Sequence, residues 1–207
     1  MLESLLLVCS LCIDTFVASI AYGTDKIKIP FSSAMIINIV CSLFLAFSLF
    51  LGSIFKDFLN PSVATSVSFC LLFLLGVYRL FESFFKKYIR KYSNIGVPLT
   101  FKVFDFKFVL EIYANEIKAD YDKSKVLNCK EAFYLAVALS LDSLAVGFGS
   151  SLGSVNYVEV VILSLIIGLC SLLLGSYLGS KFAQKANINL SWLSGAILIL
   201  LAFIRTM

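Results

Sequence analysis

Two aspartates lie in the middle of hydrophobic stretches, where a carboxylate is costly to keep. Asp14 lies in LCIDTFVASIAYG, and Asp142 lies in LSLDSLAVGFGSS, 128 positions later (142 minus 14). A charged side chain at bilayer depth costs about 2.5 to 3.5 kcal/mol on insertion scales, so it usually has a partner or faces a water-filled cavity. The similar surroundings of the two aspartates predict an internal repeat, and their position favours an ion pathway.

Hydroxyl side chains beside the aspartates add oxygen atoms to this pair. Two carboxylates near a pseudo-twofold axis can offer up to four oxygens to a divalent cation. The chain contains no histidine, the commonest ligand of zinc and copper, so oxygen ligands and hard cations are favoured. We predict a substrate site in which Asp14 and Asp142 bind the metal, assisted by Thr15, Ser143 and Ser140. The alternative is that each aspartate only bonds a neighbouring helix.

Small residues recur at every fourth position after each aspartate. They are Thr15, Ser19 and Gly23 in the first stretch, and Ser143, Gly147 and Ser151 in the later one. Four-residue spacing places each set on one helix face, and small faces let helix backbones approach closely. We therefore expect the first and fourth spans to pack together and to bring the aspartates near one another.

The composition predicts an integral membrane protein with helical spans. The chain is 60% hydrophobic and 14% charged, which is far from a soluble domain. A hydrocarbon core of about 30 Å needs about 20 apolar residues, and the alternating pattern of a membrane barrel is absent. We predict an all-α polytopic fold with six transmembrane helices over roughly 2–22, 31–55, 62–85, 131–152, 157–179 and 189–206.

The six spans divide into two halves of three. LGSIFK at 51–56 resembles LGSKFA at 178–183, at nearly the offset of the aspartates. Because three is odd, the second half must enter the membrane from the opposite side. We therefore expect two inverted three-helix repeats, 1–85 and 131–207, joined by a loop at 86–130; secondary transporters commonly have this symmetry.

The loop at 86–130 sets the expected orientation. It holds ten of the 17 lysines and arginines: Lys86, Lys87, Arg90, Lys91, Lys102, Lys107, Lys118, Lys123, Lys125 and Lys130. The positive-inside rule then predicts a cytoplasmic loop with both termini outside. Basic residues beside hydrophobic segments are explained by topology and anionic lipid, so the expected partners are the bilayer and a cation rather than nucleic acid. Homo-oligomerisation is left open.

The same loop carries a second candidate metal site. Five side chains stand at positions 1, 3, 5, 9 and 12 of an EF-hand spacing: Asp120, Asp122, Ser124, Asn128 and Glu131. The preceding segment has helical periodicity with Phe108, Ile112 and Ile117 inward. Lys125 stands where an EF-hand has glycine, which lowers the expected affinity. Calcium or magnesium in 120–131 and an ordinary solvated loop remain alternatives, and no permanently bound cofactor is expected.

The paired motifs IDTFVASIAYG and ALSLDSLAVGFG, with YGTDKIKIPFSS and the AD-x-D-x-S…KEA segment, resemble the manganese efflux pump (MntP) family. The similarity is greater to its sporulation membrane protein (YtaF) branch and covers nearly the whole chain. It implies a six-helix bacterial cell-membrane protein, from a spore former, in which Asp14 and Asp142 take part in cation export. The manganese pumps carry another acidic residue in the second span. Here that span offers Asn38, Cys41, Ser42 and Ser48.

Three functions remain to be compared. The first is a secondary transporter exporting a divalent cation, with manganese as one candidate. The second is a non-transporting sporulation membrane protein whose loop binds calcium or a partner. The third is an intramembrane aspartyl protease that uses the two aspartates as a catalytic dyad. No GxGD sequence surrounds Asp142, so we expect a transporter and not an enzyme.

Overall fold

The chain folds into helices throughout the part that the structure describes. The computed structural model describes residues 2–93, 109, 112–113, 116–153, 155–181 and 191–204. It contains a short 3-10 helix, η1 (Glu116–Ala119), and α1 (Leu2–Thr24), α2 (Phe31–Asp57), α3 (Pro61–Ser93), α5 (Cys129–Ser151), α6 (Tyr157–Lys181) and α7 (Ser191–Ile204). Across these residues the only extended pairing is an isolated parallel bridge between Lys28 and Val126.

Local sequence explains where several helices begin. Pro30 precedes α2 in an extended conformation, and Pro61 opens α3, where the missing N–H costs no helical hydrogen bond. At the start of α5, the Glu131 carboxylate accepts a hydrogen bond from the backbone N–H of Asn128 at 2.9 Å. This is the reciprocal half of a capping box, and it fixes the first turn of the helix that carries Asp142.

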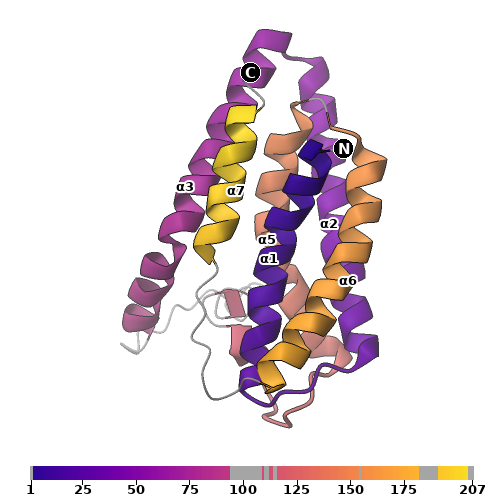
Figure 1. Ribbon diagram of the computed structural model, residues 1–207, viewed down its shortest axis with the longest axis vertical. Helices are drawn as coiled ribbons and strands as arrows, with labels where there is room; N and C mark the ends of the chain where they lie inside the picture. Colours follow the sequence, from indigo (N-terminus) through magenta and orange to yellow (C-terminus); the bar gives the residue numbers. More distant parts are fainter. Residues whose placement is uncertain are drawn as a thin grey trace, which may run out of the picture.

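Four long helices form the centre of the molecule as two parallel pairs (Figure 1). In the first pair, Ser4 of α1 bonds Glu159 of α6 at one end, and Gly23 approaches Gly179 at the other. In the second pair, Ser33 at the start of α2 bonds the carbonyl of Leu127 beside the start of α5. Since α1 and α2 are antiparallel neighbours along the chain, α1 and α5 run in opposite directions.

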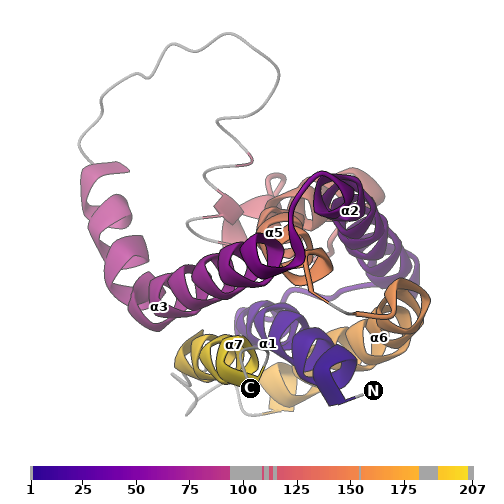
Figure 2. The same cartoon turned by 90° about the horizontal axis from the view of Figure 1, so that it is seen from above.

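The helices α3 and α7 form a third pair beside this centre. Phe69 and Phe73 of α3 contact Phe203 of α7 with ring centroids 5.6 and 6.2 Å apart. These contacts join the beginning of α3 to the end of α7, so this pair is antiparallel. Figure 2 shows both helices lying on one side of the bundle.

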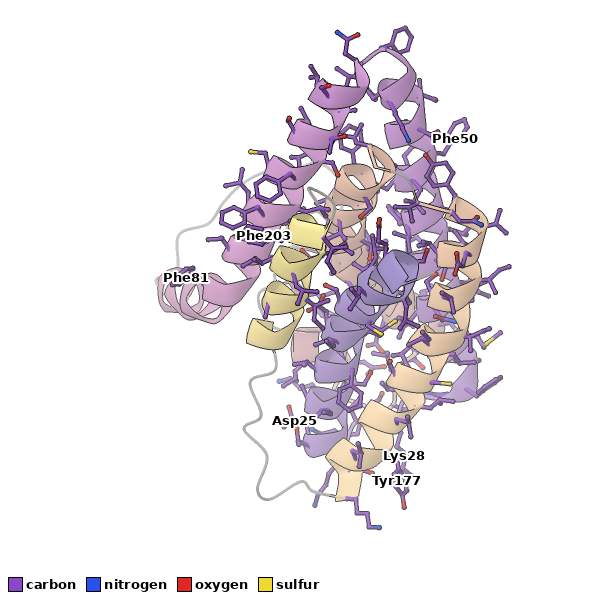
Figure 3. All side chains as sticks on the ribbon, turned by 45° about the horizontal axis from the view of Figure 1, so that its top comes forward. Asp25, Lys28, Phe50, Phe81, Tyr177 and Phe203 are labelled. Carbon is purple, nitrogen blue, oxygen red and sulfur yellow. The ribbon has the colours of Figure 1, made fainter. Side chains whose placement is uncertain are left out.

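The buried apolar residues form two clusters at different heights of the bundle. The first, which includes Leu11, Leu45 and Leu198, joins α1, α2 and α7. The second, which includes Ile37, Leu135 and Leu172, lies nearer the loop end. Large apolar side chains also face outward: Phe50 is 62% exposed, and it points away from α2 in Figure 3. An apolar exterior is suited to lipid.

The helical fold class is confirmed, and within the residues that the structure describes four helices are long and apolar enough to cross a membrane. These are Glu3–Thr24, Phe31–Lys56, Cys129–Ser151 and Tyr157–Lys181. In the expected third span, the apolar part that the structure describes is the shorter Ser62–Tyr78, and α3 continues to Ser93, beyond the expected end at 85. The described part of α7 has 14 residues.

The prediction that the first span packs mainly against the fourth is wrong. The small faces do pack closely, but α1 packs chiefly on α6 and α5 chiefly on α2. A Cβ at Gly175 of α6 would lie 2.7 Å from the Phe16 carbonyl oxygen of α1, and one at Gly147 would lie 3.0 Å from Ser48 of α2. Small faces fit any matching helix, so spacing alone did not select the partner.

Candidate functional site

A small cavity, with several polar side chains in a mainly apolar lining, lies between the four central helices at mid-height. Its volume is about 30 Å³, and its polar lining residues are Thr15 of α1, Asn38 and Ser42 of α2, Ser143 of α5 and Ser164 of α6. Apolar residues from both buried clusters complete its wall: Leu11, Cys12, Ile37, Leu45 and Leu172. The cavity therefore lies between the two apolar clusters and holds hydroxyl and amide groups where the surrounding bundle is apolar.

Hydrogen bonds between α2 and α6 shape one wall of this cavity. The Asn38 amide nitrogen donates to the Leu165 carbonyl at 2.8 Å, and Ser164 donates to the Ser42 hydroxyl at 3.2 Å. The oxygen of the same amide lies against Gly168, where a Cβ would come within 2.5 Å of it. Asn38 is 6% exposed, so glycine at 168 leaves the space that this buried amide occupies.

Neither Asp14 nor Asp142 is among the residues that line the cavity. Each aspartate immediately precedes a lining residue, Thr15 or Ser143, and both carboxylates are half-buried. One oxygen of Asp14 is fully enclosed by protein. Their helices touch only slightly. Thr15 and Ser143 therefore share the cavity, while neither carboxylate lines it.

Asp142 accepts a hydrogen bond from a tyrosine of the segment that joins α3 to α5. The Tyr113 hydroxyl donates to Asp142 Oδ1 at 3.2 Å, and the Tyr78 hydroxyl of α3 lies 3.3 Å from that of Tyr113. A phenol that donates to a carboxylate stabilises its charged form. This short chain of polar groups connects Asp142 to the loop and to α3.

Ser140, the remaining residue of the predicted substrate site, lies elsewhere. It is fully buried, and its hydroxyl donates to the Val137 carbonyl one turn earlier at 2.8 Å. It does not line the cavity.

The predicted loop site brings all three of its carboxylates together. Ligand oxygens of Asp120, Asp122 and Glu131 lie within 4.8 Å of one another. Ser124 and Asn128, the other two residues of the pattern, are exposed beside them. In the preceding segment Ile112 is fully buried and Ile117 is half-buried, as expected, whereas Phe108 lies outside the described residues.

Sequence reasoning missed Ser164, Gly168 and Tyr113 as parts of the candidate site. The first two stand four residues apart in the fifth span, in the same small-residue spacing that singled out the first and fourth spans. That spacing was a usable signal. Tyr113 carries no comparable signal, because its contact with Asp142 joins segments 29 positions apart through a loop.

Comparisons with known proteins support a membrane transport family. The family model described as "Putative manganese efflux pump" matches residues 74–204. The chain is 30% identical to "Putative manganese efflux pump MntP" of Bacteroides thetaiotaomicron over 87% of this chain and 81% of that protein. It is 29% identical to "Probable sporulation protein YtaF" of Bacillus subtilis over 73% of each chain. No solved structure matches it.

These matches confirm the resemblance seen in the paired aspartate motifs. A further relative, "Putative manganese efflux pump MntP" of Aliarcobacter butzleri, is 26% identical over 97% of this chain and 96% of its own length. The similarity thus extends over both halves and over the four helices that bound the cavity. The chain belongs to the family described as "Putative manganese efflux pump".

Proposed function

We propose that this protein is a secondary transporter that exports a divalent cation through the polar cavity between α1, α2, α5 and α6. One observation carries the proposal: hydroxyl groups and one amide from four helices line a cavity at mid-height, and two of the lining residues directly follow Asp14 and Asp142 in the sequence. Intramembrane carboxylates that adjoin polar cavities commonly mark ion pathways.

The size of the cavity suits an ion that has shed its water. A volume of about 30 Å³ holds one or two water-sized groups, so a fully hydrated cation does not fit. A dehydrated cation needs oxygen ligands in place of its water shell. Thr15, Asn38 and Ser143 provide neutral oxygens, and the aspartates provide the charge that offsets a divalent ion.

Movement of the aspartates would complete the site. Asp14 and Asp142 stand one residue before the lining residues Thr15 and Ser143. Consecutive helical residues point about 100° apart, so α1 and α5 would have to rotate substantially, or their side chains swing, to bring the carboxylates to the cavity. An aspartate that alternates between metal-bound and protonated forms would exchange cations for protons. Such alternation is one way to drive export without ATP.

The helix directions support an inverted repeat as the framework for this movement. The α1–α6 pair is parallel, the α2–α5 pair is parallel, and the α3–α7 pair is antiparallel. If the two halves are exchanged, α1 takes the place of α5, α2 that of α6 and α3 that of α7. The α1–α6 pair then becomes the α5–α2 pair, and the α3–α7 pair becomes itself. A twofold axis in the membrane plane has this effect, and the cavity would lie close to it.

Manganese is the first substrate to test. The family description and two relatives name manganese efflux. Asn38 supplies a neutral amide at the cavity and adds no charge to the proposed site. The two aspartates are then its only carboxylates, and together they balance the charge of one divalent cation. The non-transporting alternative has less support, because the family model describes a pump, although one relative is named for sporulation.

Metal accumulation in cells tests this function. Cells that express the protein should hold less manganese than cells that lack it, while magnesium, calcium and iron measured in the same samples serve as competing substrates. Asp25→Asn, in the connection between α1 and α2, is the control variant. Equal contents of all four metals with and without the protein would contradict export of any of them.

A further inference from the structure

The loop before α5 contains a group of carboxylates that the proposed transport pathway does not use. Ligand oxygens of Asp120, Asp122 and Glu131 converge within 4.8 Å, and none of these residues lines the mid-height cavity. Three carboxylates so close together repel one another unless cations or hydrogen bonds offset the charge.

Asp120 is the member of this group that hydrogen bonds leave incomplete. Its side chain is 8% exposed, and its buried Oδ1 has no hydrogen-bond partner among the residues that the structure describes. A buried acceptor without a partner is costly, more so when it is charged. A bound cation would supply the missing interaction.

Other oxygen-bearing residues of the 120–131 segment are brought together in pairs by hydrogen bonds. The Asn128 amide donates to Asp122 Oδ2 at 3.0 Å, which brings positions 3 and 9 of the EF-hand spacing together. The Ser124 hydroxyl donates to the Val126 carbonyl at 2.9 Å, which does the same for positions 5 and 7. These pairs and the carboxylate group together comprise the oxygen donors of an EF-hand loop.

Glu131 holds the group to the start of α5. Its Oε1 accepts the backbone N–H of Tyr121 at 3.0 Å, and its Oε2 accepts that of Asn128 at 2.9 Å. Both oxygens of Glu131 therefore face back into the loop. In an EF-hand, the glutamate at this position 12 binds the ion through both oxygens.

The backbone also adopts the turns that such a loop needs. Lys123 and Lys125 have φ values of 54° and 62°, in the left-handed region that glycine normally occupies. Lys125 is at position 6, where an EF-hand has glycine to make its sharp turn. The lysine therefore takes the required conformation, at the cost of strain and of a positive charge near the ion.

Contacts outside the loop hold it against the membrane helices. Lys28 and Val126 form a parallel bridge, with N–H···O distances of 2.8 and 2.9 Å through Lys125 and Leu127. The Lys125 ammonium donates to the Asp25 carbonyl at 3.0 Å. The 120–131 segment is thereby fixed to the connection between α1 and α2, at the end of the bundle where Figure 3 shows Asp25 and Lys28.

From these observations we propose that residues 120–131 bind one divalent cation of the calcium class, separately from the transported ion. Lys123, Lys125 and Lys130 offset the three carboxylates, so the dissociation constant should be on the order of 10⁻⁴ to 10⁻³ M, the weak end of the EF-hand range. The ion would join the α1–α2 connection to the first turn of α5.

Isothermal titration calorimetry, in which calcium is added to the purified full chain in detergent, tests this site. Asp122→Asn should weaken calcium binding at least tenfold. Asp122 is exposed, so this variant should fold as the wild type does. Asp120→Asn should do the same. Asp25→Asn removes a nearby charge but no ligand, and it should bind as the wild type does. The double variant Asp14→Asn with Asp142→Asn should keep the loop's calcium binding.

A variant that binds calcium more tightly provides a second test, because a folding defect would weaken binding rather than strengthen it. Lys125→Gly removes both the strained conformation and the positive charge, so calcium binding should tighten several-fold. Calcium binding unchanged in Asp120→Asn and Asp122→Asn would overturn the proposal, as would a loss seen only in the Asp14 and Asp142 double variant. Failure of Lys125→Gly to tighten binding would also count against it.

Discussion

At the scale of single residues, the candidate transport site depends on Asn38. Its amide nitrogen bonds the Leu165 carbonyl, while its oxygen lies against Gly168 beside the cavity. A hydrogen bond between helices in a membrane is worth about 0.6 to 2 kcal/mol, so this contact joins α2 to α6 and holds the amide at the cavity. Replacing its neighbours should alter transport without touching either aspartate.

Gly168→Ala should reduce transport several-fold. The new Cβ would lie 2.5 Å from Asn38 Oδ1, so the amide must turn away from the cavity or lose its bond to Leu165. Gly149→Ala is the matched control, because a Cβ there would meet its nearest atom at 3.4 Å, an ordinary contact. Transport rates in vesicles measure the difference. Equal rates in the two variants would show that the Asn38 amide has no part in the pathway.

Tyr113→Phe should lower the KM for the cation about twofold or more. A cation that binds Asp142 must displace the Tyr113 hydroxyl, which lies 3.2 Å from Oδ1, and phenylalanine removes that competition. Tyr78→Phe leaves the Tyr113–Asp142 bond in place, so its KM should stay nearer the wild-type value. Initial rates over a range of cation concentrations separate these outcomes. A raised KM in Tyr113→Phe would instead make the tyrosine a ligand.

The sequence predicted Thr15 and Ser143 as parts of the site, and both line the cavity. Their proximity to intramembrane aspartates was the signal. It could not predict that Ser140 turns back to its own helix, because a buried hydroxyl satisfies itself equally well with a carbonyl one turn earlier. Whether Asp14 and Asp142 bind the ion stays a prediction.

At the scale of helices, close packing between the two halves positions the cavity. The α1–α6 contact is made through Gly23, Gly175 and Gly179, and the α2–α5 contact through Gly52 and Gly147. The four-residue spacing predicted which faces are small. It did not predict their partners, since every small face can accept another and the choice depends on how all the helices fit together.

Gly175→Ala should destabilise the protein by about 1 to 3 kcal/mol, as overpacking of a close contact does. The added Cβ would lie 2.7 Å from both the Phe16 carbonyl oxygen and Ser19 Cβ, and the backbone cannot move aside as a flexible side chain can. Thermal unfolding in detergent should show a lower Tm than for Gly149→Ala. An unchanged Tm would mean that α1 and α6 are packed less closely than described here.

At the scale of the whole molecule, different contacts hold the two ends of the bundle. The connection at 25–29 joins the 120–131 loop at one end, and Lys56 donates to the Gly153 carbonyl at 2.7 Å at the other. Hydropathy predicted six spans, and four helices in the described residues are long and apolar enough to cross a membrane. The orientation given by the positive-inside rule stays a prediction. The extension of α3 to Ser93 was not predicted, because its last turns are basic and aromatic rather than apolar.

Labelling of cysteine with a membrane-impermeant thiol reagent tests this orientation. Cys129 is exposed at the loop end, so it should react only after the membrane is permeabilised, and the signal should vanish in Cys129→Ala. Phe58, at the opposite end, is 84% exposed. Phe58→Cys in the Cys129→Ala background should react in intact cells. The reverse pattern would place the loop outside.

Transport by purified protein in liposomes tests the central claim most directly. Vesicles loaded with manganese should lose it through the wild-type protein and through Asp25→Asn. Asp14→Asn and Asp142→Asn preserve side-chain shape but remove the charge, so each should reduce the rate at least a hundredfold while inserting normally. Wild-type rates in both variants would contradict the assignment of the two intramembrane aspartates to the cation pathway.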